Sequence, residues 1–211
     1  MIKHIALVST LAVSLLASFA VQAADTTELK VKGTIRPAAC TPSFAGGDVV
    51  DYGVIMVNTL KAGVKTVLPA KSVEFIIACD GPAKIAIKVI DNRAGSIPSG
   101  VATAYGLGTI NGTKIGGYSL NTGAATTDGT AAARAFSADK TKWNNIGEWE
   151  SNVVPSEFYT WYKNSSVATP QAFSTLKLTV NVQATLDKPE NLPLTQEIPL
   201  DGSATFQIEY L

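Results

Sequence analysis

The sequence predicts an all-β sandwich, and three observations lead to this fold class. Apolar and polar residues alternate with a period of two along several segments, which is the pattern of half-buried β-strands. Clusters of glycine and proline separate these segments, as turns between short strands require. No window of helical length carries a capped apolar stripe with a period of 3.6 residues. Short strands without helices favour two packed sheets around one core.

The alternation is clearest in segments that proline and glycine separate. Pro37 interrupts the first segment, and Asp80-Gly81-Pro82 is a turn signal after the second. The apolar stretch 49–57 adds a further strand signal. The alternating segments are, in chain order, 29–35, 73–79, 85–89, 176–186 and 205–210. The last one places Phe206, Ile208 and Tyr210 on one side of a half-buried strand.

The first residues predict export. A basic start, Lys3 and His4, precedes an uncharged apolar run over 5–20, and small residues follow. This is the pattern of a secretory signal peptide over 1–23, with cleavage after Ala23 or Ala24. A membrane anchor is disfavoured, because the run is short and no charged stop follows it. No other stretch could span a bilayer, so we expect no membrane span in the mature chain.

Composition argues against several function classes. Cleavage leaves about 187 residues, which suits one domain with a substantial core. Seventeen basic and seventeen acidic residues balance, so no basic face for nucleic acid is expected. The only histidine, His4, leaves with the signal peptide. Without a histidine the usual general base of serine and cysteine hydrolases is missing, so we predict no catalytic residues. No cofactor or metal motif is present either.

Two cysteines, Cys40 and Cys79, form an isolated pair. In an exported protein such a pair predicts one disulfide. It would close a loop of about 40 residues, which stabilises the fold by ~4 kcal/mol in the chain-entropy model. A redox pair is the alternative, but the C-x-x-C spacing is absent.

The middle of the chain differs from the rest. Segment 121–133 is small and weakly polar, so we expect a surface loop there. Aromatic residues flank it, including Trp149 and the run Phe158-Tyr159-Thr160-Trp161-Tyr162. They could form a sugar-binding platform. The simpler interpretation is a strand that buries Phe158 and carries Tyr159 or Trp161 on a sheet surface.

Several motifs, in order along the mature chain, resemble subunits of chaperone–usher pili. The chain is most similar to a fimbrial-like family of Gram-negative bacteria in the broad type 1 pilin class. A penultimate tyrosine on an alternating strand, here Tyr210, is the most specific feature of that class. The motifs that carry the resemblance are Gly-Thr-Ile-Arg-Pro-Ala-Ala-Cys-Thr-Pro (33–42), Asp-Tyr-Gly (51–53), Cys-Asp-Gly-Pro (79–82), Asp-Asn-Arg (91–93), Gly-Leu-Gly (106–108) and Leu-Asp-Gly-Ser-Ala-Thr-Phe (200–206).

The resemblance implies an immunoglobulin-like sandwich that lacks its final strand. A periplasmic chaperone would supply this strand along Phe206, Ile208 and Tyr210, and an outer-membrane usher would then exchange it for the N-terminal extension of a neighbouring pilin subunit. It implies a donor extension over 24–32, with Thr27, Leu29 and Val31 as its plugs. The pilin domain would cover 33–211, with a loop-rich insertion around 111–165. The expected product is a homopolymeric surface fimbrium that contributes to adhesion.

Three alternatives remain open. The first is a monomeric periplasmic or surface sandwich that binds carbohydrate. The second is a secreted hydrolase, which the missing histidine disfavours. The third concerns assembly: only about nine residues separate the cleavage site from Gly33. So short an extension could complete its own fold instead of a neighbour's.

Overall fold

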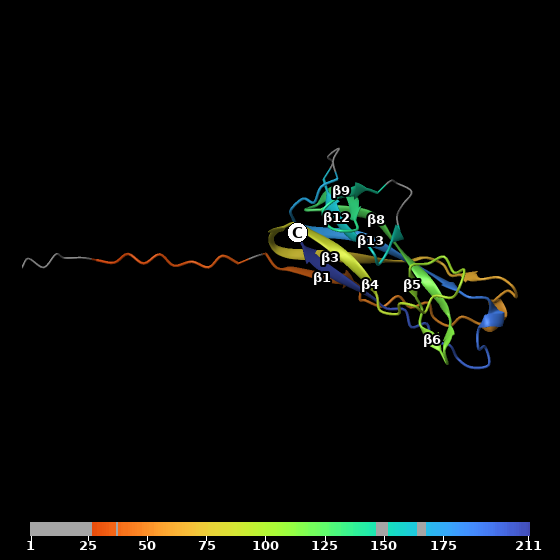
Figure 1. Ribbon diagram of the computed structural model, residues 1–211. Coiled ribbons are helices and arrows are strands. Elements are labelled where there is room, and N and C mark those ends of the chain that lie inside the picture. Colours follow the sequence, from red (N-terminus) through yellow and green to blue (C-terminus); the bar gives the residue numbers. More distant parts are fainter. Residues whose placement is uncertain (1–26, 37, 147–151, 164–167) are drawn as a thin grey trace, which may run out of the picture. The chain divides into compact units, whose positions relative to one another are not determined.

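A computed structural model describes residues 27–36, 38–146, 152–163 and 168–211 (Figure 1). The expected signal peptide and its cleavage site lie outside these residues. The chain divides into two units, Met1–Arg36 and Pro37–Leu211. In the first unit, residues 27–36 are extended without strand pairing. Their apolar side chains are open to solvent, with Leu29 88%, Val31 91% and Ile35 101% exposed.

The second unit is built from strands and two short 3-10 helices in the part of the chain that is described. Its elements are β1 Cys40–Ala45, η1 Val57–Thr59, β2 Thr66–Val67, β3 Lys71–Ala83, β4 Ile85–Asp91, β5 Tyr105–Gly106, β6 Thr109–Ile110, β7 Thr113–Lys114, β8 Gly116–Thr127, β9 Thr130–Ser137, β10 Asn144–Asn145, β11 Asn152–Val153, β12 Phe158–Tyr162, β13 Phe173–Leu186, η2 Pro189–Asn191 and β14 Ala204–Tyr210. The predicted all-β class is therefore confirmed.

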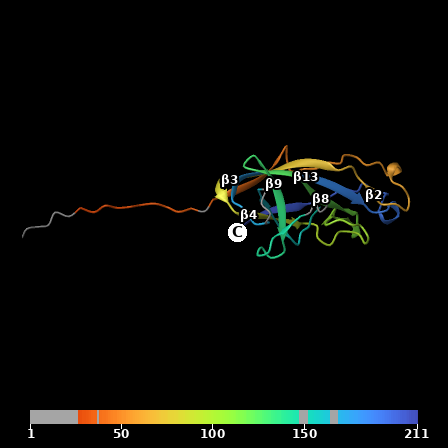
Figure 2. The ribbon, with the colours of Figure 1, turned by 90° about the horizontal axis from the view of Figure 1, so that it is seen from above.

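The strands form two layers that are continuous at one side. One layer has the order β1-β3-β13-β8, and the other has the order β9-β12-β4-β14. The β8–β9 hairpin joins the layers, so the open edges of the arrangement are β1 and β14. The layers are antiparallel throughout, and the long strand β13 runs between β3 and β8 (Figure 2).

Alternation along the central strands produces the core. In β13, Leu176, Leu178 and Val180 are at most 3% exposed, while the residues between them face outward. The same period buries Phe75 and Ile77 in β3. Two sheets that each present one apolar face bury those faces against each other. The predicted period-two segments in 73–79, 85–89 and 176–186 all belong to this core.

The predicted disulfide is confirmed. Cys40 opens β1 and lies opposite Cys79 of β3, with the two sulfurs 2.06 Å apart. The bond fixes the edge strand β1 to the centre of its layer.

Three local expectations are wrong. Segment 121–133 is not a surface loop, because β8 and β9 form a hairpin across it. Asp128 and Gly129 both have positive φ, at 48° and 75°, and Asp-Gly is a strong signal for such a two-residue turn. The first strand of the body begins at Cys40 instead of near Gly33. The strand signal at 49–57 also fails, since that segment forms no strand before η1.

Candidate functional site: an open groove between β1 and β14

The two edge strands face each other across a gap in the sandwich. β1 pairs only with β3, and β14 pairs only with β4, among the described residues. The two strands run in opposite directions, because the N–H of Cys40 at the start of β1 donates to the hydroxyl of Tyr210 at the end of β14 over 2.8 Å. Phe44 and Phe206 meet further along, with ring centroids 5.2 Å apart. Each strand thus presents an unpaired backbone edge toward the other.

A groove of about 630 Å³ lies between these edges. Phe44 and Phe206 line its walls, and apolar residues from the layer that contains β1 also line it. These are Val73, Leu120, Val180 and Val182. We call the end at Cys40 and Tyr210 the tyrosine end, and the end at Ala45 and Ala204 the loop end. An apolar groove flanked by two free strand edges is a site for an additional strand.

The three residues predicted for this site share β14 but differ in burial. Phe206 and Ile208 are partly buried against the core, whereas Tyr210 is 52% exposed. Phe206 also packs against Phe75, with ring centroids 4.9 Å apart. Phe206 lines the groove, whereas Ile208 and Tyr210 are not among its lining residues. Tyr210 closes the tyrosine end through its hydrogen bond.

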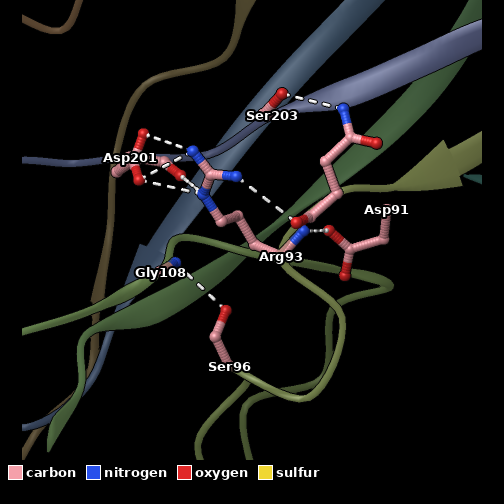
Figure 3. Close-up of polar contacts among 7 residues, drawn as sticks. Asp91, Arg93, Ser96, Gly108, Asp201 and Ser203 are labelled. Atoms are coloured by element: carbon pink, nitrogen blue, oxygen red, sulfur yellow. Dashed lines mark hydrogen bonds and ion pairs between the residues drawn. The ribbon is translucent and has the colours of Figure 1, made fainter. Parts of the chain in front are cut away.

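A polar cluster holds the chain that leads into β14 (Figure 3). The Arg93 guanidinium donates to both carboxylate oxygens of Asp201 over 2.9 Å, and also to its carbonyl over 3.0 Å. Asp91 accepts from the N–H of Arg93, and Ser96 accepts from the N–H of Gly108. The Arg93 hydrogen bond lowers the pKa of the Asp201 carboxyl from its ordinary value. The cluster thus fixes the 200–203 segment, which lines the loop end.

Gly202 lies at the closest point of this segment to the core. A Cβ there would lie 2.8 Å from Cε1 of Tyr118 and 3.1 Å from Cδ2 of Leu107. Both neighbours line the groove. A glycine is therefore needed for the backbone to pass this close to them. Sequence reasoning noted the Asp-Asn-Arg and Leu-Asp-Gly-Ser motifs without placing them together.

The aromatic run in β12 does not form a surface platform. Tyr159, Trp161 and Tyr162 are at most 5% exposed. Phe158 is the partly exposed member. Its ring centroid lies 5.1 Å from the Nζ of Lys88 and 5.0 Å from the Nζ of Lys140. The observed orientation is therefore the reverse of the expected one, because Tyr159 and Trp161 are buried in the core and Phe158 is partly exposed. Trp149 lies outside the described residues.

Clusters of metal-binding side chains and membrane-spanning helices are both absent from the described part of the chain. Its His, Cys, Asp and Glu residues form no cluster that could hold a metal ion. None of its helices is long and apolar enough to cross a membrane. The hydroxyl of Ser96 accepts a structural hydrogen bond from the N–H of Gly108.

The predicted plugs Thr27, Leu29 and Val31 all lie in the exposed first unit. Ile35 shares their parity and is fully exposed, but the prediction assigned it to the body. The signal that could have found it is Pro37, which separates Ile35 from the first strand of the body. Ile35 therefore lies in the same exposed unit as the predicted plugs.

One family model matches part of the chain, and two relatives match most of it. The family described as protein of unknown function (DUF1120) matches residues 29–133. Uncharacterized protein YhcF of Escherichia coli (strain K12) is 28% identical over 224 residues, with 90% of this chain and 92% of that protein covered. Protein GltF of the same strain is 28% identical over 236 residues, with 92% and 93% covered. No solved structure matches the chain. These similarities are compatible with the fimbrial-like resemblance, and neither name states an activity.

Proposed function

We propose that this protein is a structural subunit of a surface fimbria whose sandwich is completed by a strand from another polypeptide. The observation that carries the proposal is the apolar groove between the unpaired edges of β1 and β14. A strand that lies in it pairs with one or both edges and places alternate side chains over the core. Left open, such edges invite uncontrolled pairing, so a dedicated occupant is needed.

The N-terminal extension has the properties of that occupant. Its residues 27–35 are extended and carry apolar groups at Leu29, Val31 and Ile35, with charged lysines between them. Nine extended residues span about 30 Å, and the seven residues of β14 span about 23 Å. Burial of three such side chains is worth ~1.5–3 kcal/mol each, before any backbone hydrogen bonds. A neighbouring subunit's extension is therefore long enough to pair along β14, and its apolar residues at 29 and 31 alternate as those of a strand do.

The remaining parts of the proposed pathway come from the resemblance to chaperone–usher pilins. A periplasmic chaperone would protect the groove after export, and an outer-membrane usher would catalyse the exchange for the next subunit's extension. The subunit itself needs no catalytic residue or cofactor, because folding and strand exchange supply the free energy. The assembled fibre would lie at the cell surface and support adhesion.

A peptide of residues 25–36 tests the proposal directly. Added to the purified mature chain, it is expected to raise the unfolding temperature and to block the growth of multimers, because a bound strand stabilises only the folded state. The control peptide carries Val31→Asp, which places a charge over the apolar groove. A chain that unfolds at the same temperature with either peptide, and that stays monomeric without them, would contradict the proposal.

A further inference from the structure

The two strand edges beside the groove differ in the backbone groups that they offer. In an antiparallel pair, residues that exchange both backbone hydrogen bonds alternate with residues that exchange none. A residue of the second kind points its N–H and its C=O away from the paired strand. The register of β1 on β3 and of β14 on β4 therefore identifies the backbone groups on each open side.

On β14 the open side carries a full set of groups. The carbonyl of Ser203 accepts from the N–H of Asn92 over 3.0 Å, and the N–H of Leu211 donates to the carbonyl of Lys84 over 3.0 Å. Odd positions therefore bond on the β4 side. Because the register between them is continuous, the even positions point away from β4. The residues that turn both an N–H and a C=O to the open side are Ala204, Phe206, Ile208 and Tyr210.

On β1 the same reasoning selects three residues. The N–H of Asp80 in β3 donates to the carbonyl of Ala39 over 3.0 Å, so odd positions bond on the β3 side. The N–H of Cys40 points the other way, because it donates to the Tyr210 hydroxyl of β14. The residues of β1 that face the open side are Cys40, Pro42 and Phe44.

Two of these three residues offer no free donor. Pro42 has no N–H, because its ring closes on the backbone nitrogen. The N–H of Cys40 is occupied by the Tyr210 hydroxyl at 2.8 Å. Within β1, whose residues are all described, Phe44 alone keeps an N–H for a partner on this side. A proline whose nitrogen faces the open side protects an edge strand against pairing.

The difference between the edges matters because both border the groove. Its lining includes Pro42 and Phe44 from β1, and Ala204 and Phe206 from β14. A strand that paired along β1 would bring one backbone carbonyl to Pro42 without a donor for it, and a buried carbonyl without a partner is destabilising. The same strand along β14 would find a donor and an acceptor at every second residue.

We infer that Pro42 makes the groove one-sided: the extension of a second copy forms its backbone ladder along β14 and forms none along β1. This inference rests on the proposed function and specifies how the added strand is held. A strand held by one ladder breaks fewer hydrogen bonds when it leaves than a strand held by two. Pro42 thus determines which edge the strand pairs with and keeps the bound strand exchangeable.

Backbone esters in the 25–36 peptide test which edges are used. An ester oxygen in place of one N–H removes a single donor without adding bulk, and successive N–H groups of a strand between two others point to opposite edges. One pair of peptides carries the ester at Leu29 or Val31, and the other pair at Lys30 or Lys32. In whichever direction the strand lies, one pair is expected to bind about tenfold more weakly than the unmodified peptide, and the other pair equally well.

The outcomes of this comparison separate the inference from the proposed function. Weaker binding by both pairs shows ladders on both edges and overturns the one-sided groove. Equal binding by both pairs shows no ladder and overturns it as well. Failure of the unmodified peptide to bind overturns the proposed function instead.

Pro42→Ala tests the role of the proline. The new N–H adds a donor to the open side of β1, so dissociation of the unmodified peptide is expected to slow about fivefold. Thr41→Ala is the matched control, because residue 41 bonds on the β3 side, and its peptide should dissociate at the wild-type rate. Wild-type dissociation from a folded Pro42→Ala chain overturns the role of Pro42. The ester peptides decide the one-sided ladder on the wild-type chain, so that result does not depend on the folding of either variant.

Discussion

Single residues determine the shape of the groove through close contacts at its loop end. Arg93 and Asp201 are exposed partners that join the end of β4 to the segment before β14. An exposed ion pair contributes little to stability in general. Its effect here is positional, because it fixes the 200–203 segment that lines the groove.

Asp201→Asn is expected to lower the unfolding temperature at pH 7 and to weaken binding of the 25–36 peptide. The pKa of Asp201 is lowered in the folded chain by the Arg93 hydrogen bond. The pair therefore stabilises the fold above the ordinary pKa of 3.8, and this contribution is lost as the pH falls through the lowered value. Near-ultraviolet circular dichroism during heating should show a difference between variant and wild type that shrinks toward pH 3. The exposed Glu197→Gln is the control, and a difference independent of pH would contradict the expectation.

Gly202→Ala is expected to destabilise the fold by about 1–3 kcal/mol, the usual range for overpacking. The added Cβ would push against Tyr118 and Leu107, and both line the groove. Peptide affinity should therefore fall together with stability, which denaturant unfolding and peptide titration measure separately. Gly81→Ala is the matched control, because its Cβ would meet only Ala38 at 3.8 Å. Similar effects of the two substitutions would show that the close approach at Gly202 is unimportant.

Among the elements, β14 is the one that the groove depends on most. Its alternation was visible in the sequence, and so was the position of the core strands, because burial on one face of a sheet produces a period of two. The β8–β9 hairpin could not be recognised from residue size, because its strands are rich in alanine, glycine and threonine. Such small residues are also typical of surface loops. The Asp128-Gly129 turn was the better signal.

The groove itself could not be predicted from local pattern. Phe44 and Phe206, which form its walls, are far apart in sequence, and the sequence of neither segment indicates that it forms an edge strand. Long-range pairing decides such features, and the period of a single segment carries no information about it.

Ile208→Asp is expected to reduce the yield of the folded protein and to abolish multimers. Ile208 is partly buried on the core side of β14, so a carboxylate there would lie among apolar groups. Gln207→Asp is the matched control, because the neighbouring side chain is exposed on the opposite face. Tyr210→Ala should also reduce yield, since it removes the hydroxyl that accepts from Cys40. Normal accumulation and assembly of both Ile208→Asp and Tyr210→Ala would count against a role for this strand.

At the scale of the whole molecule, one chain contains both a groove and the segment that we propose as the occupant of this groove in another copy. The body has an apolar groove, and the first unit has an apolar series with no strand partner among the described residues. Two complementary but different surfaces on one chain produce an open chain of copies when each copy binds the next. The proposed fibre would resist dissociation, because every junction would combine a buried strand with its ladder of backbone hydrogen bonds.

The extension gives the test at this scale, because its two faces differ. Leu29→Asp, Val31→Asp and Ile35→Asp are each expected to remove the ladder of multimers on gels run without boiling, since each places a carboxylate over the apolar groove. Lys30→Asp and Lys32→Asp are the controls, because these side chains alternate with the plugs and would face away from the groove. The Ile35 variant also separates two donor boundaries: loss of multimers extends the donor strand through Ile35, whereas a normal ladder ends it at Val31. If the aspartates at all three plug positions leave the ladder intact, the extension is not the strand that completes the fold.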